Sequence, residues 1–577
     1  MEETASAQLV DIMAKAGIRR IYGMAGDSLT PVMEALQQDG RIRWVHVRHE
    51  ETAAFAAGAE AQLTGMTAAC CGSCGPGNVH LVNGLYDAHR SHAPVLAIAS
   101  HIPVRFIGSC YFQETHPTRL FEDCTAYREL VSAPAQLPSV ACAALRAAQA
   151  RRDVGMIVLP GDVAAKEARG LLPDIPPRKS PHTALSAPPP LIAAMADIIN
   201  AAPRVSFLCG AGCAASRQDI INLAVQIQAP IAYTLRAKDF MEYDNPCAVG
   251  MTGLLGWGAA PQAVLESDLL ILWGTDFPYQ DFLPDTGAVI QVDTDAEALG
   301  RRVPLALGVH ADAGQVARAL LPLISLNRDG DFLTAAKERH NRYVHSLFSH
   351  IHQVNEAAPL RPEYLTRLIS DYAEPDAVFC VDTGTPVIWA ARYLQGSENR
   401  RIIGSFRHGS MACGLAMAIG AKSAYPTRQV IALCGDGGLS MLPGDILTLL
   451  QEGLAVKILV YNNSSLEMVA MEQEAAGKER MGTGLHPTDF ASMAQGMGIA
   501  GIRLRRPEDA ISAVKAWLAA KGPALLDATI DTHALPLPPD MEALRRQGFC
   551  RRYQEHSRKG YLDTVKRILF GNRRFFR

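Results

Sequence analysis

The sequence contains no apolar run approaching the roughly 20 residues that a membrane-spanning helix needs. Its charge is nearly balanced: the formal net charge of −3 gives no reason to expect nucleic acid as a ligand. Residues 1–4 lack the basic and apolar regions of a signal peptide, so we expect a cytoplasmic protein. The hydrophobic content of 48 % and the charged content of 20 % are those of an ordinary globular protein.

Regular cysteine spacing is also missing. The 13 cysteines are scattered, and several of them lie inside apolar runs, so we expect reduced thiols in a reducing compartment. Cys71 and Cys74 form one C-x-x-C pair, but no second pair follows at the spacing of a zinc site. The pair leads into a Gly-Pro-Gly turn at residues 75–77, which favours a turn over a metal site.

The chain of 577 residues is too long for a single hydrophobic core. Short apolar runs alternate with helical patterns, which predicts parallel sheets flanked by helices. The runs assigned to strands are residues 19–22, 44–47, 67–71, 95–99, 156–159, 205–209, 231–234, 269–273, 289–292, 430–434 and 456–462. The predicted fold class is α/β, with three doubly wound parallel-sheet domains and a C-terminal amphipathic helical tail.

Changes in composition predict the domain boundaries. We expect domains at residues 1–180, 181–335 and 336–535 and a tail at residues 536–577. Prolines at 176–177 and 188–190 predict an extended connector between the first two domains. The second domain opens with a Gly-x-Gly-x-x-Ala turn at residues 210–215. No acidic residue closes a second strand about 20 positions later, so a close-packed turn explains it as well as a dinucleotide site does.

Polar residues follow two neighbouring strands in the last third of the chain. Asp436 comes after the first strand and Asn463 after the second, with a helical stretch at residues 445–452 between them. Because this crossover makes the strands parallel, both carboxyl ends open on the same edge of the sheet. A carboxylate, an amide oxygen and glycine backbone suit Mg²⁺ bound to a diphosphate. A turn without a ligand also favours Gly-Asp-Gly, so other segments must decide.

Three further segments support a cofactor site formed with Asp436 and Asn463. They are the sequence His-Glu-Glu-x-Ala-Ala-Phe-Ala-Ala from residue 49, Gly-Ser-Cys-Gly-Pro-Gly-Asn at residues 72–78, and Gly-Ser-Phe-Arg-His-Gly-Ser-Met at residues 404–411. Together with Gly-Asp-Gly and Asn462-Asn463, this set resembles the thiamine diphosphate enzymes. The resemblance implies that Glu50 hydrogen-bonds the aminopyrimidine ring of the cofactor and that Glu51 is structural.

The same resemblance implies the other contacts of thiamine diphosphate and Mg²⁺. The metal ligands would be Asp436, Asn463 and the Ser465 carbonyl. The Gly409 carbonyl would accept a hydrogen bond from the cofactor, and Met411 would separate its two rings. The remaining cofactor-binding residues implied are Ser410, Gly437, Gly438, Ser464 and Leu466.

Several other segments resemble one branch of that family, the bacterial pyruvate oxidases that reduce ubiquinone. They lie at residues 111–116, 159–163, 243–246, 250–254 and 274–279. This resemblance implies FAD in the central domain, and the FAD-binding residues implied are Met251, Thr252, Gly253, Leu254, Gly274, Thr275, Asp276, Phe277, Pro278, Val292 and Asp293. It also implies oxidation of pyruvate to acetate and CO₂, with electrons passing through FAD to ubiquinone, and a homotetramer.

The catalytic residues implied beside Glu50 are Phe112, Met468 and Glu472. Phe112 equally fits an ordinary core residue, and Glu472 equally fits an exposed charge on a helix. The chain also departs from the oxidase pattern at Thr383, Glu467 and Met468, where the oxidases have valine, glycine and phenylalanine. The alternatives are an acetolactate synthase, a 2-oxoacid decarboxylase, an oxidase that makes acetyl phosphate, and a non-catalytic lipid-binding protein.

The C-terminal tail has a basic amphipathic pattern. At about 100° per residue, one face of a helix would carry Leu562, Val565, Ile568, Leu569, Phe575 and Phe576. Between residues 558 and 577 there are seven basic residues and one acidic residue, a net charge of +6. This pattern predicts binding to an anionic phospholipid surface, on the inner face of the cell membrane, with activation by lipid. A helix docked on its own subunit is the alternative.

Overall fold

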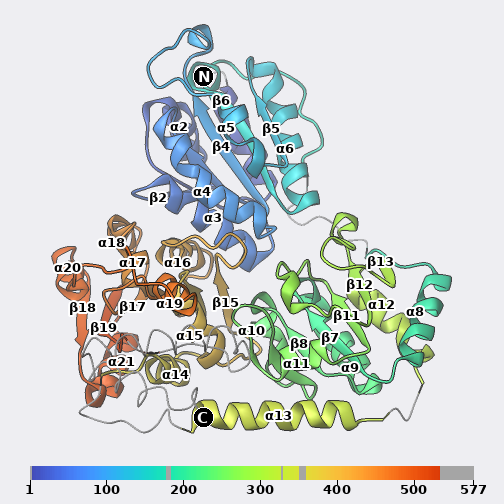
Figure 1. The fold of residues 1–577 in the computed structure, drawn as a ribbon. Coiled ribbons are helices and arrows are strands. Elements are labelled where there is room, and N and C mark those ends of the chain that lie inside the picture. The colour runs from blue at the N-terminus through green and yellow to red at the C-terminus, as the bar shows by residue number, and fades with distance from the viewer. Residues whose placement is uncertain (1–2, 177–183, 326–328, 350–358, 533, 535–577) are drawn as a thin grey trace.

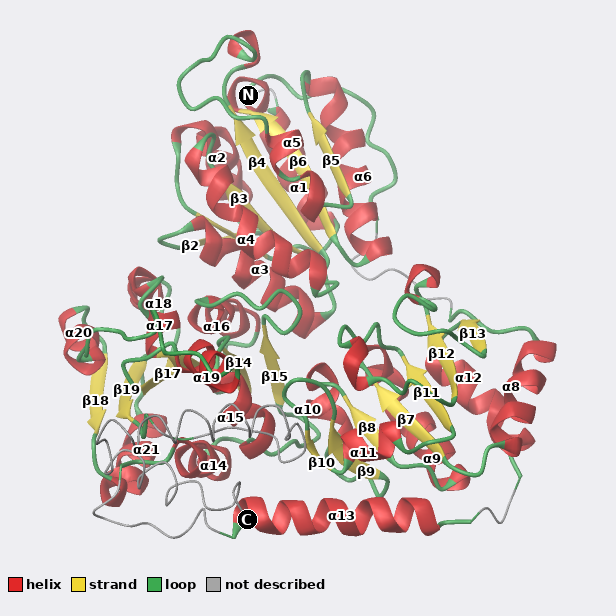
Figure 2. Cartoon of the chain, in the orientation of Figure 1, coloured by secondary structure: helices red, strands yellow, loops and turns green. Residues whose placement is uncertain are grey.

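The computed structural model describes residues 3–176, 184–325, 329–349, 359–532 and 534. These residues form three α/β domains, each built around one sheet whose two faces are covered by helices (Figures 1 and 2). The predicted fold class is confirmed for this part of the chain. The predicted tail lies outside the described residues. No helix in the described part is long and apolar enough to cross a membrane.

The first domain contains a six-stranded parallel sheet in the order β2-β1-β3-β4-β6-β5. Its strands are β1 (Arg20–Gly23), β2 (Arg43–His46), β3 (Ala68–Gly72), β4 (Val95–His101), β5 (Tyr127–Leu130) and β6 (Val154–Pro160). Its helices are α1 (Ala5–Lys15), α2 (Thr30–Asp39), α3 (Glu50–Thr64), α4 (Pro76–Arg90), α5 (Pro117–Leu120), α6 (Leu137–Arg151) and α7 (Gly161–Ala164).

The central domain contains a seven-stranded sheet in the order β10-β9-β8-β7-β11-β12-β13, in which only the β9–β10 pair is antiparallel. Its strands are β7 (Val205–Cys209), β8 (Ile231–Tyr233), β9 (Ala248–Met251), β10 (Trp257–Gly258), β11 (Leu269–Trp273), β12 (Ala288–Asp293) and β13 (Leu307–His310). Its helices are α8 (Pro189–Ala201), α9 (Arg217–Ile227), α10 (Lys238–Met241), α11 (Ala260–Leu265), α12 (Ala313–Leu320) and α13 (Asp331–Phe348).

The third domain repeats the topology of the first, with the parallel order β15-β14-β16-β17-β19-β18. Its strands are β14 (Val378–Val381), β15 (Arg401–Gly404), β16 (Val430–Gly435), β17 (Val456–Asn462), β18 (Ala500–Leu504) and β19 (Ala524–Thr529). Its helices are α14 (Pro362–Tyr372), α15 (Thr385–Tyr393), α16 (Cys413–Ala424), α17 (Asp436–Leu439), α18 (Ile446–Gln451), α19 (Glu467–Ala475), α20 (Phe490–Gly496) and α21 (Ala510–Ala519).

Helix α3 joins the first domain to the third (Figure 1). The His49 side chain caps its start by accepting from the Glu51 N–H, and Gly65 ends it with a left-handed φ of 69°. Six of the fifteen residues of α3 are alanine, so its neighbours approach very closely: a Cβ on Gly420 of α16 would lie 2.1 Å from the Ala56 carbonyl oxygen. As a result, one hydrophobic core runs from the first sheet through α3 and α16 into the third.

Candidate cofactor and active site

The turn after β16 meets the turn after β17, as the crossover predicts. Asp436 begins α17, and its Oδ2 accepts from the main-chain N–H groups of Asn463 at 3.2 Å and Ser464 at 2.5 Å. The Asn463 Oδ1 accepts from the N–H of Ser465 at 3.1 Å. Burial raises the pKa of Asp436, and the main-chain donors oppose that rise. No cationic side chain pairs with Asp436 in the part of the chain that the structure describes.

A buried carboxylate beside an amide oxygen, with no cation on it, fits the oxygen ligands that Mg²⁺ prefers. The structure thus brings together the three predicted metal ligands, Asp436, Asn463 and Ser465. Ser464 between them has a left-handed φ of 55°. Such strain in a non-glycine residue marks a turn whose shape is enforced by its contacts.

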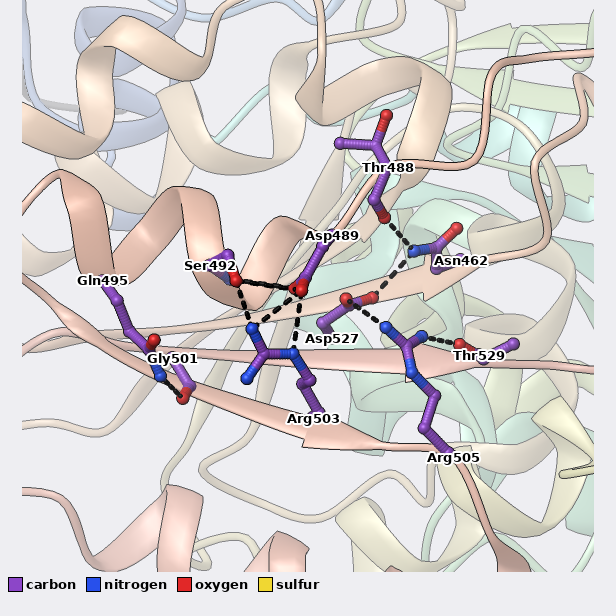
Figure 3. A network of polar contacts seen from close by, with 10 residues as sticks. All are labelled: Asn462, Thr488, Asp489, Ser492, Gln495, Gly501, Arg503, Arg505, Asp527 and Thr529. Atoms are coloured by element: carbon purple, nitrogen blue, oxygen red, sulfur yellow. Dashed lines mark hydrogen bonds and ion pairs between the residues drawn. The ribbon is translucent and has the colours of Figure 1, made fainter.

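Asn462 has a different task from Asn463. Its Nδ2 donates to Asp527 Oδ1 and to the Thr488 carbonyl oxygen, both at 2.8 Å (Figure 3). Arg505, which follows β18, contacts the other oxygen of Asp527 and also bonds Thr529. These contacts tie the ends of β17, β18 and β19 together. Asn462 therefore fixes the end of the strand from which Asn463 turns toward Asp436.

The site occupies the switch point of the third sheet, where the strand order reverses between β14 and β16. Asp382, which follows β14, faces α17: a Cβ on Gly438 would lie 1.9 Å from its Oδ2. That oxygen is buried without a partner among the described residues, and burial raises the pKa of Asp382 to about 7. Gly437 also leaves no room for a side chain, because a Cβ there would lie 2.6 Å from Leu466 Cδ2 and 3.3 Å from Met411 Cε. Predicted cofactor residues from three segments therefore meet at α17.

Glu50 lies in the first turn of α3 and is 5 % exposed. Its Oε2 is 2.9 Å from His80 Nδ1, and the His80 ring stacks on His49. A Cβ on Gly77 would lie 2.8 Å from Glu50 Oε1, so the glycine leaves room for the carboxyl group. The carboxyl group is thus held in one place by α3 and α4.

The predicted FAD residues gather at the carboxyl-end edge of the central sheet. They end β9 and β12 and form the turns after β9 and β11, and Trp273 pairs with Val292 in register. A Cβ on Gly253 would lie 3.0 Å from the Phe277 ring, so the first two turns touch. The Thr252 hydroxyl is buried without a partner among the described residues, and burial raises the pKa of Asp293. The unpartnered Thr252 hydroxyl, at the carboxyl ends of these parallel strands, fits a bound dinucleotide.

The neighbouring turn at residues 210–215 is a close-packed turn. The N–H of Gly210 donates to the Trp273 carbonyl oxygen, and the N–H of Gly212 donates to the Gly274 carbonyl oxygen. A Cβ on Gly212 would lie 2.8 Å from Gly274 Cα. The glycines here serve close packing of two turns.

Arg407 links the two candidate cofactor regions. It belongs to the loop at residues 405–411, and its Nη2 lies 3.0 Å from Oδ2 of Asp276 in the predicted FAD turn. Its Nη1 lies 3.0 Å from His92 Nε2, and burial together with Arg407 lowers the pKa of His92 to about 4. The neutral ring can accept from the guanidinium group. One side chain thus connects all three domains.

The other predicted catalytic residues, Phe112, Met468 and Glu472, are more exposed to solvent than Glu50. Phe112 is 78 % exposed, so it is not a core residue and the described residues of this chain do not enclose it. Met468 is half-buried and Glu472 exposed on α19. Glu467, at the position of the oxidase glycine, is 4 % exposed and pairs with Arg480 through two bonds of 3.0 and 2.9 Å. This ion pair ties the start of α19 to the segment that follows it.

The sequence matches three family models, described as the thiamine pyrophosphate enzyme N-terminal TPP binding domain at residues 3–120, the central domain at 192–320 and the C-terminal TPP binding domain at 382–528. It is also 33 % identical to a putative thiamine pyrophosphate-containing protein of Bacillus subtilis, over 95 % of each chain. The chain belongs to the thiamine pyrophosphate enzyme family. Thiamine pyrophosphate is another name for thiamine diphosphate, and its binding is supported by these matches.

Two relatives carry the names of different activities within that family. Pyruvate oxidase of Lactiplantibacillus plantarum is 30 % identical over 93 % of this chain and 90 % of the relative. The acetolactate synthase large subunit of Parasynechococcus marenigrum is 31 % identical over 90 % of this chain and 86 % of the relative. The family models each lie inside one predicted domain and leave the domain boundaries and the site residues as predictions.

Proposed function

We propose that the protein oxidises pyruvate to acetate and CO₂ and passes the two electrons through FAD to membrane ubiquinone. In sum, pyruvate, water and quinone give acetate, CO₂ and quinol. Bound thiamine diphosphate would supply the electron sink for decarboxylation, and FAD would accept the electron pair. Acetolactate synthesis and non-oxidative decarboxylation remain the alternative, because an acetolactate synthase is an equally similar relative.

The chain's own residues have separable tasks in this proposal. Asp436, Asn463 and Ser465 hold the metal, and Glu50 holds a proton at the pyrimidine ring. Glu50 is 5 % exposed and contacts His80 of α4, so its carboxyl group would meet the pyrimidine ring with little competition from water.

The Arg407–Asp276 ion pair is the observation that carries the proposal. It joins the loop assigned to the thiamine ring to the turn assigned to FAD across 3.0 Å. Electron transfer between two bound groups requires that their binding segments keep a fixed relation. A homotetramer is part of the proposal, in which a partner subunit would cover the exposed Phe112.

Anaerobic flavin reduction tests this function. The protein loaded with thiamine diphosphate, Mg²⁺ and FAD is mixed with pyruvate without oxygen, and the visible flavin absorbance and the products are followed. We expect the flavin to bleach, with one acetate and one CO₂ formed per flavin reduced. Acetolactate or acetaldehyde formed beside an unbleached flavin would establish the non-redox alternative, and acetyl phosphate formed with phosphate and O₂ would establish the other oxidase.

The membrane part of the proposal rests on the sequence of the tail. Deletion of residues 555–577 is expected to abolish binding to vesicles of anionic phospholipid, because each cation near the surface contributes about 1 kcal/mol. Turnover with a soluble artificial acceptor is expected to remain. Vesicle flotation of the full-length and truncated proteins measures the difference, and equal flotation would refute a membrane role for the tail.

A further inference from the structure

The loop at residues 405–411 lies between β15 and α16 and carries Gly409 and Met411, two residues assigned to the rings of thiamine diphosphate. Its backbone is strained at its end, because Ala412 has a left-handed φ of 67°. A non-glycine residue keeps this conformation only where its surroundings enforce it. The loop therefore needs an external support, and the contacts of its side chains show where that support lies.

Each of the four polar side chains in this loop bonds the first domain of the same chain. The Ser405 Oγ donates to Asp87 Oδ1 at 2.7 Å, and Arg407 bonds His92. His408 and Ser410 both bond Asn83. Gly409 and Met411 are left for the cofactor. The contacts lie more than 300 residues apart in sequence, with separations of 318, 325 and 327 for the bonds of Asp87 and Asn83.

The support is one face of α4, formed by Asn83, Tyr86 and Asp87, which we call the loop-docking face. Residues spaced by three and four positions lie on the same side of a helix. The Tyr86 ring stacks on His408 with 5.6 Å between centroids and an interplanar angle of 8°. Asp87 is fully buried, and burial raises its pKa to about 7. The loop-docking face thus provides a ring-stacking contact and a buried hydrogen-bond acceptor for the loop.

Asn83 lies at the centre of this face and uses both ends of its amide. Its Oδ1 accepts from His408 Nε2 at 2.8 Å, since an amide oxygen can only accept. Its Nδ2 donates to Ser410 Oγ at 2.8 Å and to Glu51 Oε1 at 2.7 Å. Glu51 neighbours Glu50 in the first turn of α3. One amide therefore connects the turn that carries the proton-holding acid to the loop that carries Met411.

We propose that Asn83 is a positioning residue that fixes the loop at residues 405–411, and with it the thiamine ring, from the first domain of the same chain. The inference rests on the proposed thiamine site and adds the residue that orients it. Asp87 supports the same loop: the Ser405 Oγ that it holds accepts from the N–H of Ser410 at 3.0 Å. Neither side chain needs to touch the cofactor.

The test compares cofactor affinity with cofactor activation. Asn83→Ala is saturated with thiamine diphosphate and Mg²⁺, and the exchange of the thiazolium C2 proton for deuterium is followed by rapid quench and proton NMR. We expect exchange to slow by about 10- to 100-fold, because a small misplacement of reacting groups has effects of that size. The dissociation constant should change by less than about tenfold, since the magnesium turn is untouched.

Matched variants separate positioning from general damage. Tyr425→Phe removes another hydrogen bond between the first and third domains, from the Tyr425 Oη to the Leu63 carbonyl oxygen, and should leave exchange unchanged. Asp87→Asn keeps an acceptor for Ser405 and should exchange faster than Asp87→Ala. If Asn83→Ala does not fold, His408→Phe keeps the ring stack on Tyr86, loses the bond to Asn83 and should slow exchange.

Exchange within twofold of wild type in folded Asn83→Ala would overturn the inference, as would equal slowing in Tyr425→Phe. Failure of the wild-type protein to bind thiamine diphosphate at all would count against the proposed function instead.

Discussion

Replacement of Glu50 by glutamine is expected to lower pyruvate turnover by about 10²- to 10⁴-fold, the usual contribution of a positioned acid or base. Glutamine matches the shape of the buried side chain and can still bond His80, so the local fold should persist. It cannot exchange a proton with the pyrimidine ring, which is the task that we assign to Glu50. The measurement is steady-state turnover with a soluble electron acceptor, beside calorimetric titration with thiamine diphosphate.

The calorimetric titration is expected to show nearly unchanged cofactor affinity in Glu50→Gln. Glu122→Gln is the matched control, because the Glu122 side chain is 71 % exposed in the same domain and pairs only with Arg128 in the described structure. Its turnover should equal that of the wild type. Full turnover in Glu50→Gln would show that this residue is not the proton-holding acid.

Replacement of Asp436 by alanine is expected to weaken magnesium-dependent binding of thiamine diphosphate by at least about 100-fold. Two losses add in this variant: the one carboxylate among the three predicted metal ligands, and the acceptor for the N–H groups of Asn463 and Ser464. Contacts of a charged group contribute up to about 3 kcal/mol, which corresponds to more than 100-fold in affinity. Titrations with and without Mg²⁺ measure the effect.

Asp489→Asn is the control for this variant. Asp489 belongs to the same domain and is 41 % exposed, where it pairs with Arg503 and caps α20 (Figure 3). Its cofactor affinity should match that of the wild type. If Asp436→Ala retained tight, magnesium-dependent binding, the metal site would have to be sought elsewhere in the chain.

Much of the sheet structure follows from short apolar runs. The expected strands at residues 205–209 and 269–273 coincide with β7 and β11. Strands β5 and β18 are among those that were not predicted. Both lie at sheet edges and are only partly buried, so their sequences lack a continuous apolar run. The expected helix at residues 445–452 is α18 at Ile446–Gln451, preceded by a 3-10 turn at Pro443–Asp445. The side chain of Asp445 accepts from the Arg48 N–H and the Thr52 hydroxyl of the first domain.

Part of the candidate site could likewise be predicted from the sequence, and part of it could not. The meeting of Asp436 with Asn463 could be expected, because a parallel crossover places two strand ends on one edge. Asn83, Asp382 and Arg407 were missed because their roles depend on how distant segments pack. The Gly-Asp-Gly motif does not indicate that Asp382 packs against it. The position of Asp382, directly after a buried strand, was nevertheless a signal from which this residue could have been predicted. The pairing of Glu467 with Arg480 likewise required the folded chain.

The core shared by α3 and α16 has a consequence for protein synthesis. During translation, α3 leaves the ribosome before α16, because Cys413 comes 349 positions after Thr64. At a synthesis rate of about 5–20 residues per second, the alanine-rich surface of α3 stays uncovered for roughly 20–70 s until α16 has been made. During that interval the first domain cannot bury this part of its hydrophobic core. The nascent chain therefore exposes an apolar surface to which a chaperone can bind.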